Sequence, residues 1–211
     1  MIGPDAVELR VLGALIEKQR ATPDAYPLSL NALRLAANQS TGRDPVTGYD
    51  EGELRDAIAR LVRRGWARLA SGPGSRAAKY HQLLDEAVAL DGAAISLLAL
   101  LMLRGPQTSG ELRARSERLH DFASVAQVEE CLEALAARGF AVRFERRAGQ
   151  KESRWGLDGP FLGEAAVEDA DEERGPAAEP GEVGLTERVA RLERELSELR
   201  EVVARLREIV E

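Results

Sequence analysis

The sequence has few aromatic residues, a single cysteine and no long apolar run. Phe, Trp and Tyr make up 4% of the 211 residues, so the core must be built mainly from Leu, Ala and Val. The one cysteine, Cys131, excludes a disulfide within the chain and fits a reducing compartment. The longest apolar stretch, residues 93–103, is about half of the roughly 20 residues that a membrane-spanning helix needs.

The first residues also lack the basic and apolar regions of a signal peptide. Hydrophobic residues are 44% and charged residues 31% of the chain, which is typical of a globular protein with a highly charged surface. Together these features predict a cytoplasmic, mostly helical protein with no membrane partner.

The chain also offers little for catalysis. Its two histidines, His81 and His120, lie far apart in the sequence, and neither has cysteines or carboxylates at metal-ligand spacing. Cys131 shares a helical apolar stripe with Val128 and Leu132, which predicts a packing role. Glycine-rich phosphate loops, nucleophile elbows and zinc patterns are absent from the sequence. We therefore expect no catalytic residues, no metal and no cofactor, and interpret the protein as a non-enzyme.

An internal repeat organises the first 160 residues. Residues 53–66 match residues 127–140 at an offset of 74, with apolar positions, a glycine and an aromatic residue in register. The economical interpretation is two copies of one module, which we call module one (residues 1–85) and module two (residues 86–160).

Each module has the pattern of three helices followed by a pair of strands. In module one, Asp50 and Glu53 form a capping box at the start of the third helix, and Gly65 is the expected glycine after its end. Strands are expected at residues 66–70 and 78–83 around a turn-rich tip. Three helices and a two-stranded wing describe a winged helix-turn-helix, so we predict a mainly α fold with small β-hairpins (α+β).

In module two, alternation predicts which face of the strand pair is buried. Phe140, Val142 and Phe144 alternate with small or charged residues, which is typical of a half-buried strand. Trp155 and Leu157 are expected to return on the same buried face.

The composition changes near residue 160. Residues 161–184 are rich in Glu, Asp, Ala, Pro and Gly and predict a disordered acidic linker. Residues 185–211 then follow a heptad pattern, with apolar residues at Leu185, Val189, Leu192, Leu196, Leu199, Val203, Leu206 and Val210. Leu at d and mostly Val at a favour a parallel two-stranded coiled coil and hence a homodimer. The alternative is a single amphipathic helix packed on its own domain.

Several stretches resemble a known family. They are EKQ at 17–19, YPLSLN at 26–31, NQ at 38–39, KYH at 79–81, LRGPQT at 103–108, GELR at 110–113 and GQKESR at 149–154. With these stretches, the chain resembles the YceH-like family of largely uncharacterised bacterial proteins, and the resemblance covers residues 5 to about 157, in order. The resemblance implies a tandem winged-helix fold and supplies no activity.

A winged helix suggests double-stranded DNA as the partner. Such a module places its third helix in the major groove of the DNA. The third helix of module one opens with Asp50, Glu51, Glu53 and Asp56, and that of module two carries Glu129, Glu130 and Glu133. Acidic residues there suit the helix dipole but repel phosphates. We therefore expect DNA contact through the wings and through the basic C-terminal part of the third helix of module one. Such contact predicts weak sequence specificity and a transcription-related role. The candidate residues are Arg60, Arg63, Arg64, Arg76, Lys79, Arg113, Arg115, Arg143, Arg146, Arg147, Lys151 and Arg154. Arg55 and Arg68 add to the basic residues of module one.

A protein-interaction scaffold without DNA contact is the competing interpretation, and the acidic third helices fit it better. The net charge of −7 does not decide between the two, because it is unevenly distributed. Residues 1–85 carry 12 basic and 10 acidic side chains, residues 86–160 carry 10 and 11, and residues 161–211 carry 7 and 15. The two modules are therefore close to neutral, and the acidity belongs to the C-terminal part.

Overall fold

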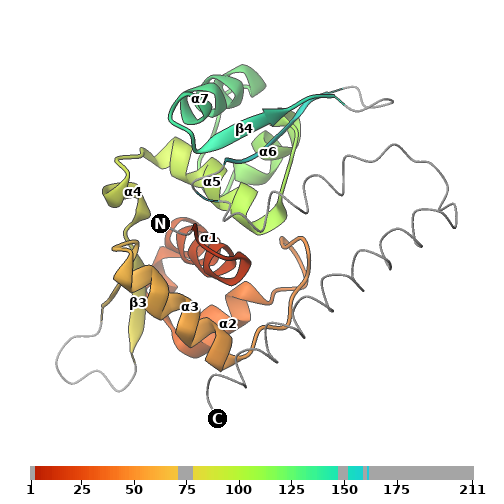
Figure 1. Cartoon of the computed structure of the whole chain (residues 1–211). Helices are drawn as coiled ribbons and strands as arrows, with labels where there is room; N and C mark the ends of the chain where they lie inside the picture. The colour runs from red at the N-terminus through yellow and green to blue at the C-terminus, as the bar shows by residue number, and fades with distance from the viewer. Residues whose placement is uncertain (1–2, 71–77, 147–151, 159–160, 162–211) are drawn as a thin grey trace, which may run out of the picture. The chain divides into compact units, whose positions relative to one another are not determined.

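The computed structural model describes residues 3–70, 78–146, 152–158 and 161 (Figure 1). In module one the chain forms α1 (Ala6–Ala21), a short 3-10 turn η1 (Pro23–Ala25), β1 (Leu28–Ser29), α2 (Leu30–Ala37), α3 (Glu51–Arg63), β2 (Ala67–Leu69) and β3 (Lys79–Gln82). A single helical turn, α4 (Leu84–Ala87), leads to module two, which forms α5 (Gly92–Arg104), α6 (Ser109–Ser116), α7 (Val125–Ala137), β4 (Ala141–Phe144) and β5 (Arg154–Leu157). The α+β class is confirmed, and the structure adds η1 and β1 between the first two helices, which the sequence pattern did not predict.

Local sequence signals set the helix ends. Asp50 and Glu53 form a reciprocal capping box at α3, and Thr108 and Glu111 form one at α6. After α3, Gly65 has a φ of +75°, a left-handed conformation that a residue with a side chain adopts only with strain. These signals are short-range, which is why the sequence predicts them well.

The strands of both modules share one plan. In module one the sheet order is β1-β3-β2, all antiparallel, with Leu28 opposite Tyr80. In module two, β4 pairs with β5, and Gln107 forms an isolated antiparallel bridge with Trp155. Gln107 precedes α6 as β1 precedes α2, so in each module the segment before the second helix extends the strand pair.

The expectation that Phe140, Val142 and Phe144 share one face with Trp155 and Leu157 is wrong. Ala141 is buried, whereas Phe140, Val142 and Phe144 are only partly buried. Trp155 and Leu157 are buried as expected, but the register places Trp155 opposite Arg143 and Leu157 opposite Ala141. The guanidinium of Arg143 lies 5.6 Å from the centre of the Trp155 ring, so a charged residue covers the buried face. Phe144 instead lies against Gly156 on the other face.

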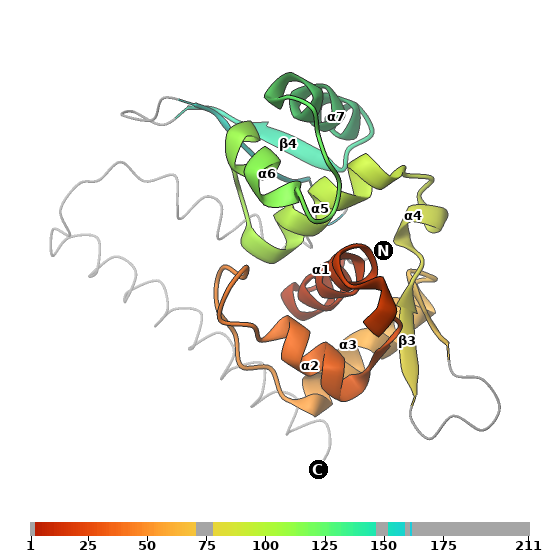
Figure 2. The same cartoon turned by 180° about the vertical axis from the view of Figure 1, so that it is seen from behind.

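The two modules pack together through their first helices. α1 contacts α5, and an added Cβ on Gly13 of α1 would meet Leu103 Cγ at 2.9 Å. Asp44 N donates to the carbonyl of Leu103 at 2.9 Å, and Arg20 Nε donates to the carbonyl of Leu119 at 2.8 Å. Both views show α1 and α5 side by side, with α3 and α7 at opposite ends of this unit (Figures 1 and 2). The third helices of the two modules, α3 and α7, are therefore far apart and do not form one shared surface.

Some predicted features lie outside the described residues. These are the turn at residues 71–75, the acidic linker, the heptad series from Leu185 to Val210, and the candidate cations Arg76, Arg147 and Lys151. Among the described residues, no helix is long and apolar enough to cross a membrane. The same part of the chain holds no group of three or more His, Cys, Asp or Glu side chains that could bind a metal ion.

Candidate nucleic-acid interface

The four arginines of α3 and its C-cap divide into two sets. Arg60 and Arg64 are partly buried and turn toward α1, whereas Arg55 and Arg63 are exposed on the other side of the helix. Arg55 lies 3.8 Å from Glu51 one helical turn earlier, and 60% of its side chain is exposed. Exposed pairs of this kind contribute little to stability, so Arg55 is available to an external anion.

The inner set surrounds a buried carboxylate on α1. The side chain of Glu8 is 3% exposed. Its carboxylate forms ion pairs with Arg60 Nε and Arg64 Nε, each at 3.1 Å. Arg60 also contacts Asp5 Oδ2 at 2.6 Å. Desolvation acts to lower the pKa of Arg60, but the hydrogen bonds and charges of Glu8 and Asp5 outweigh it and raise the pKa. Arg60 and Arg64 therefore hold α3 on α1.

The loop between α2 and α3 is fixed by two buried arginines. Arg43 forms a two-pronged ion pair with Glu17, and it also donates to the carbonyl of Ala36 through Nε at 3.0 Å and Nη2 at 2.8 Å. Arg10 of α1 donates to the carbonyl of Pro45 at 2.7 Å. These bonds set the position at which α3 begins.

The strand pair of module one carries further basic residues at its surface. Arg68 on β2 and Lys79 on β3 are exposed. Arg68 lies opposite His81, whose ring is 5.0 Å from that of Tyr26. Burial, followed by the charge of Arg68, lowers the pKa of His81, so this histidine is neutral at pH 7 and adds no positive charge. Module one therefore exposes basic side chains on α3 and on its strand pair: Arg55, Arg63, Arg68 and Lys79.

The candidate residues of module two are mostly engaged within the protein. Arg115 donates to Gln107 Oε1 at 2.6 Å, and Arg154 lies 3.5 Å from Glu111. Burial opposes ionisation of Glu111, but the backbone hydrogen bond from Thr108 and the charges of the two arginines lower its pKa overall. Arg113 donates to the carbonyls of residues 122 and 123.

The exposed face of α7 differs in charge from that of α3. It presents Glu129, Glu130 and Glu133, the helix contains no lysine or arginine, and Arg138 is its C-cap. Arg146, beyond β4, is exposed. The sequence predicted the basic residues but not their partners, because Asp5 and Glu8 are 50 or more residues away from Arg60 and Arg64.

The fold and this surface define a class: an α+β protein of two repeated three-helix modules, one of which exposes basic residues on its third helix. The family model described as "Protein of unknown function, DUF480" matches residues 5–150, and the chain belongs to this family. The resemblance to YceH-like proteins agrees with this membership.

The related proteins carry only family names. A "UPF0502 protein" of Pelobacter propionicus is 46% identical over 208 residues, covering 97% of this chain and 93% of the relative. One of Chromobacterium violaceum is 45% identical over 204 residues, covering 96% and 90%. One of Pseudomonas aeruginosa strain LESB58 is 51% identical over 150 residues, covering 71% and 67%. These names assign no activity to the relatives.

Proposed function

We propose that the protein is a tandem winged-helix protein that binds double-stranded DNA through module one, with weak sequence specificity. In module one, three helices are followed by a strand pair that β1 extends, and this order of elements supports the winged-helix interpretation. Such a module places its third helix in the major groove and its strand pair near the flanking backbone.

One observation carries this proposal: α3 exposes Arg55 and Arg63 beside the acidic residues of its first two turns (Glu51, Glu53 and Asp56), whereas α7 exposes Glu129, Glu130 and Glu133 and has no lysine or arginine between its caps. A duplex carries one negative charge per about 1.7 Å of its axis, so it is attracted to the exposed arginines of α3 and repelled by the exposed glutamates of α7. Arg68 and Lys79 extend the positive surface to the strands of module one. Contacts of this kind are made to phosphates and give position without reading the sequence.

A matched pair of charge reversals tests the proposal. Arg63→Glu is expected to weaken binding to a random-sequence duplex by tenfold or more at 0.1 M salt, because it removes a phosphate contact and introduces repulsion. Arg63→Glu should also reduce the slope of the logarithm of the binding constant against the logarithm of the salt concentration by about 1. Fluorescence anisotropy with a labelled duplex measures both quantities.

Arg118→Glu is the control, since Arg118 is an exposed arginine after α6 and the change in net charge is the same. It should alter the affinity by less than about twofold. Equal effects of the two variants would show that only the net charge matters, and the proposed interface would be wrong.

A protein partner remains our second proposal, and it concerns module two. The acidic face of α7 is unsuited to DNA and suited to a basic polypeptide. Homodimer formation through the heptad series stays a prediction, as do the domain limits at residues 85 and 160.

A further inference from the structure

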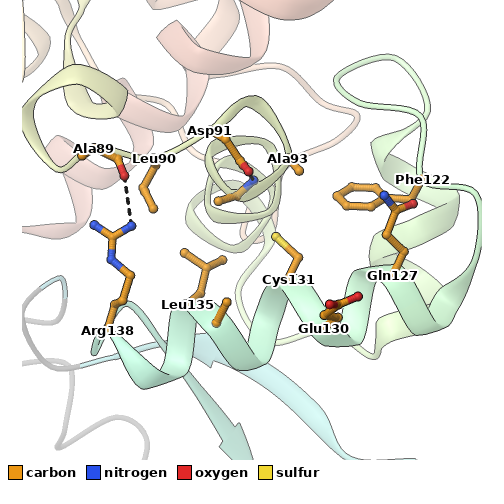
Figure 3. A pocket seen from close by; sticks show the side chains of 12 residues that line it. Ala89, Leu90, Asp91, Ala93, Phe122, Gln127, Glu130, Cys131, Leu135 and Arg138 are labelled. Carbon is orange, nitrogen blue, oxygen red and sulfur yellow. Dashed lines mark hydrogen bonds between the residues drawn. The ribbon is translucent and has the colours of Figure 1, made fainter.

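A pocket of about 420 Å³ lies beside α7 in module two. One wall is the segment that leads into α5, from Ala89 to Ala94, and the other is the side of α7 from Gln127 to Arg138. Figure 3 shows Cys131 and Leu135 pointing from α7 toward the opposite wall, where Asp91 and Ala93 lie. The lining is mainly apolar, with Asp91 and Glu130 as its acidic members.

The internal repeat provides an equivalent position in module one. Asp5 caps α1 as Asp91 caps α5, and α3 and α7 begin after the caps Asp50 and Ser124. These caps align Asp5 with Asp91 and, through the offset of 74, align residue 60 with Ala134.

Two further contacts confirm that the alignment holds in space. Arg64 donates to the carbonyl of Gly3 at 2.9 Å, and Arg138 donates to the carbonyl of Ala89 at 3.0 Å. Gly3 and Ala89 each lie two residues before their helix cap. Arg64 also lies over the ring of Trp66 at 5.6 Å, as Arg138 lies over that of Phe140 at 5.0 Å.

In module one, an arginine side chain occupies this position. Arg60 extends from α3 to Asp5 Oδ2 at 2.6 Å and to Glu8 Oε2 at 3.1 Å. In module two, the residue aligned with Arg60 is Ala134, and the residue aligned with Glu8 is Ala94. Both alanines line the pocket. The pocket is therefore the space that an arginine fills in the sister module.

One of the two acidic groups that receive Arg60 in module one is retained in module two, as the exposed Asp91. Asp91 Oδ1 accepts the capping hydrogen bond from Ala94 N at 2.8 Å, and the carboxylate makes no ion pair within the described residues. Arg138 donates to the carbonyls of Val88 and Ala89. Arg20 donates through Nε to the carbonyl of Leu119, and its Nη2 lies 2.7 Å from the position of an added Cβ on Gly92, beside Asp91 but not ion-paired with it. Burial raises the pKa of the Cys131 thiol to about 11, and the negative charges of Asp91 and Glu130 contribute to this shift.

We propose that this pocket binds an arginine side chain of a partner polypeptide, with its guanidinium paired to Asp91 and its stem against Ala94, Cys131 and Ala134. The apolar lining suits the methylene stem, and a guanidinium offers the planar, two-pronged geometry that a carboxylate accepts. Glu130 at the rim attracts a cation and repels acidic segments. This inference does not depend on DNA binding by module one.

The test uses N-acetyl-arginine amide as a probe of the arginine side chain and N-acetyl-citrulline amide as its uncharged isostere. Titration of the ¹⁵N-labelled full chain should shift the amide signals of residues 89–94 and 130–135 with arginine and not with citrulline. Asp91→Asn keeps a residue that caps helices well but removes the charge, and it should weaken binding at least fivefold. Glu117→Gln, an exposed acidic site after α6, is the matched control and should leave binding unchanged.

A second variant tests the pocket without any probe. Ala134→Arg supplies the side chain that module one has, so it should abolish probe binding and raise the melting temperature more in the native background than in Asp91→Asn. The proposal is overturned if citrulline shifts the same signals equally, if no pocket signal moves at saturating probe, or if Ala134→Arg has the same effect in both backgrounds.

Discussion

Replacing Arg43 by Ala is expected to lower the free energy of unfolding by about 3–5 kcal/mol, the range for breaking a buried ion pair. The Arg43 side chain is fully buried and lies 2.5 Å from Glu17 Oε2, with further bonds to the carbonyls of Ala36 and Gly42 and to Gln39 Oε1. Its removal leaves these carbonyl and amide oxygens without their donor, and it leaves the Glu17 carboxylate with the more distant Lys18 Nζ at 3.6 Å. Urea unfolding followed by circular dichroism measures the change.

Arg68→Ala is the matched control, because Arg68 is exposed on β2 and its loss should change stability by no more than about 0.5 kcal/mol. Removing Glu17 as well should recover part of the loss, since the carboxylate that has lost its arginine is then absent. A loss below about 1 kcal/mol for Arg43→Ala would contradict the role given to this arginine in positioning α3.

Gly13→Val should destabilise the protein by about 3 kcal/mol, the upper part of the usual range for overpacking. A Cβ at Gly13 meets Leu103 Cγ at 2.9 Å and Met102 Cβ at 3.0 Å, and both residues are buried in α5. The added side chain must therefore separate α1 from α5, which is the contact that joins the two modules. Thermal unfolding should show a lower midpoint and a broader transition as the modules lose their coupling.

Gly110→Val is the control for this change. Gly110 also lies in a helix, but the nearest atom to an added Cβ is Thr108 Oγ1 at 3.9 Å. It should therefore leave the unfolding midpoint nearly unchanged. If both valine variants behave alike, the tight contact of α1 with α5 is not what stabilises the pair of modules.

Features of the fold that depend on nearby residues could be predicted from the sequence. The capping boxes at Asp50 and Thr108 and the helix end at Gly65 follow from residues within one or two turns. The face of β4 could not be predicted, because apolar residues occur on both of its sides. The cover of Trp155 by Arg143 depends on a register that only the paired strand sets.

The candidate interface was predictable in composition but not in arrangement. Arg55, Arg60, Arg63 and Arg64 are equivalent by sequence, and their division depends on Glu8 of α1. A signal was present, since Asp5 and Glu8 form a capping box and a glutamate at that position faces the helix start. Its contact with α3 is a tertiary one, with more than 50 residues between the partners. The pocket beside α7 likewise follows only from comparing the two modules in space.

We expect module one to contact DNA and the acidic helix of module two to stay free of it. The most direct measurement is a ¹H–¹⁵N spectrum of the labelled full chain titrated with a random-sequence duplex at low salt. We expect shifts at Arg55, Arg63 and Arg68 and in β3, reversed by added salt, with the signals of Glu129 and Glu133 unmoved. Shifts confined to module two, or no shift at saturating duplex, would contradict this expectation.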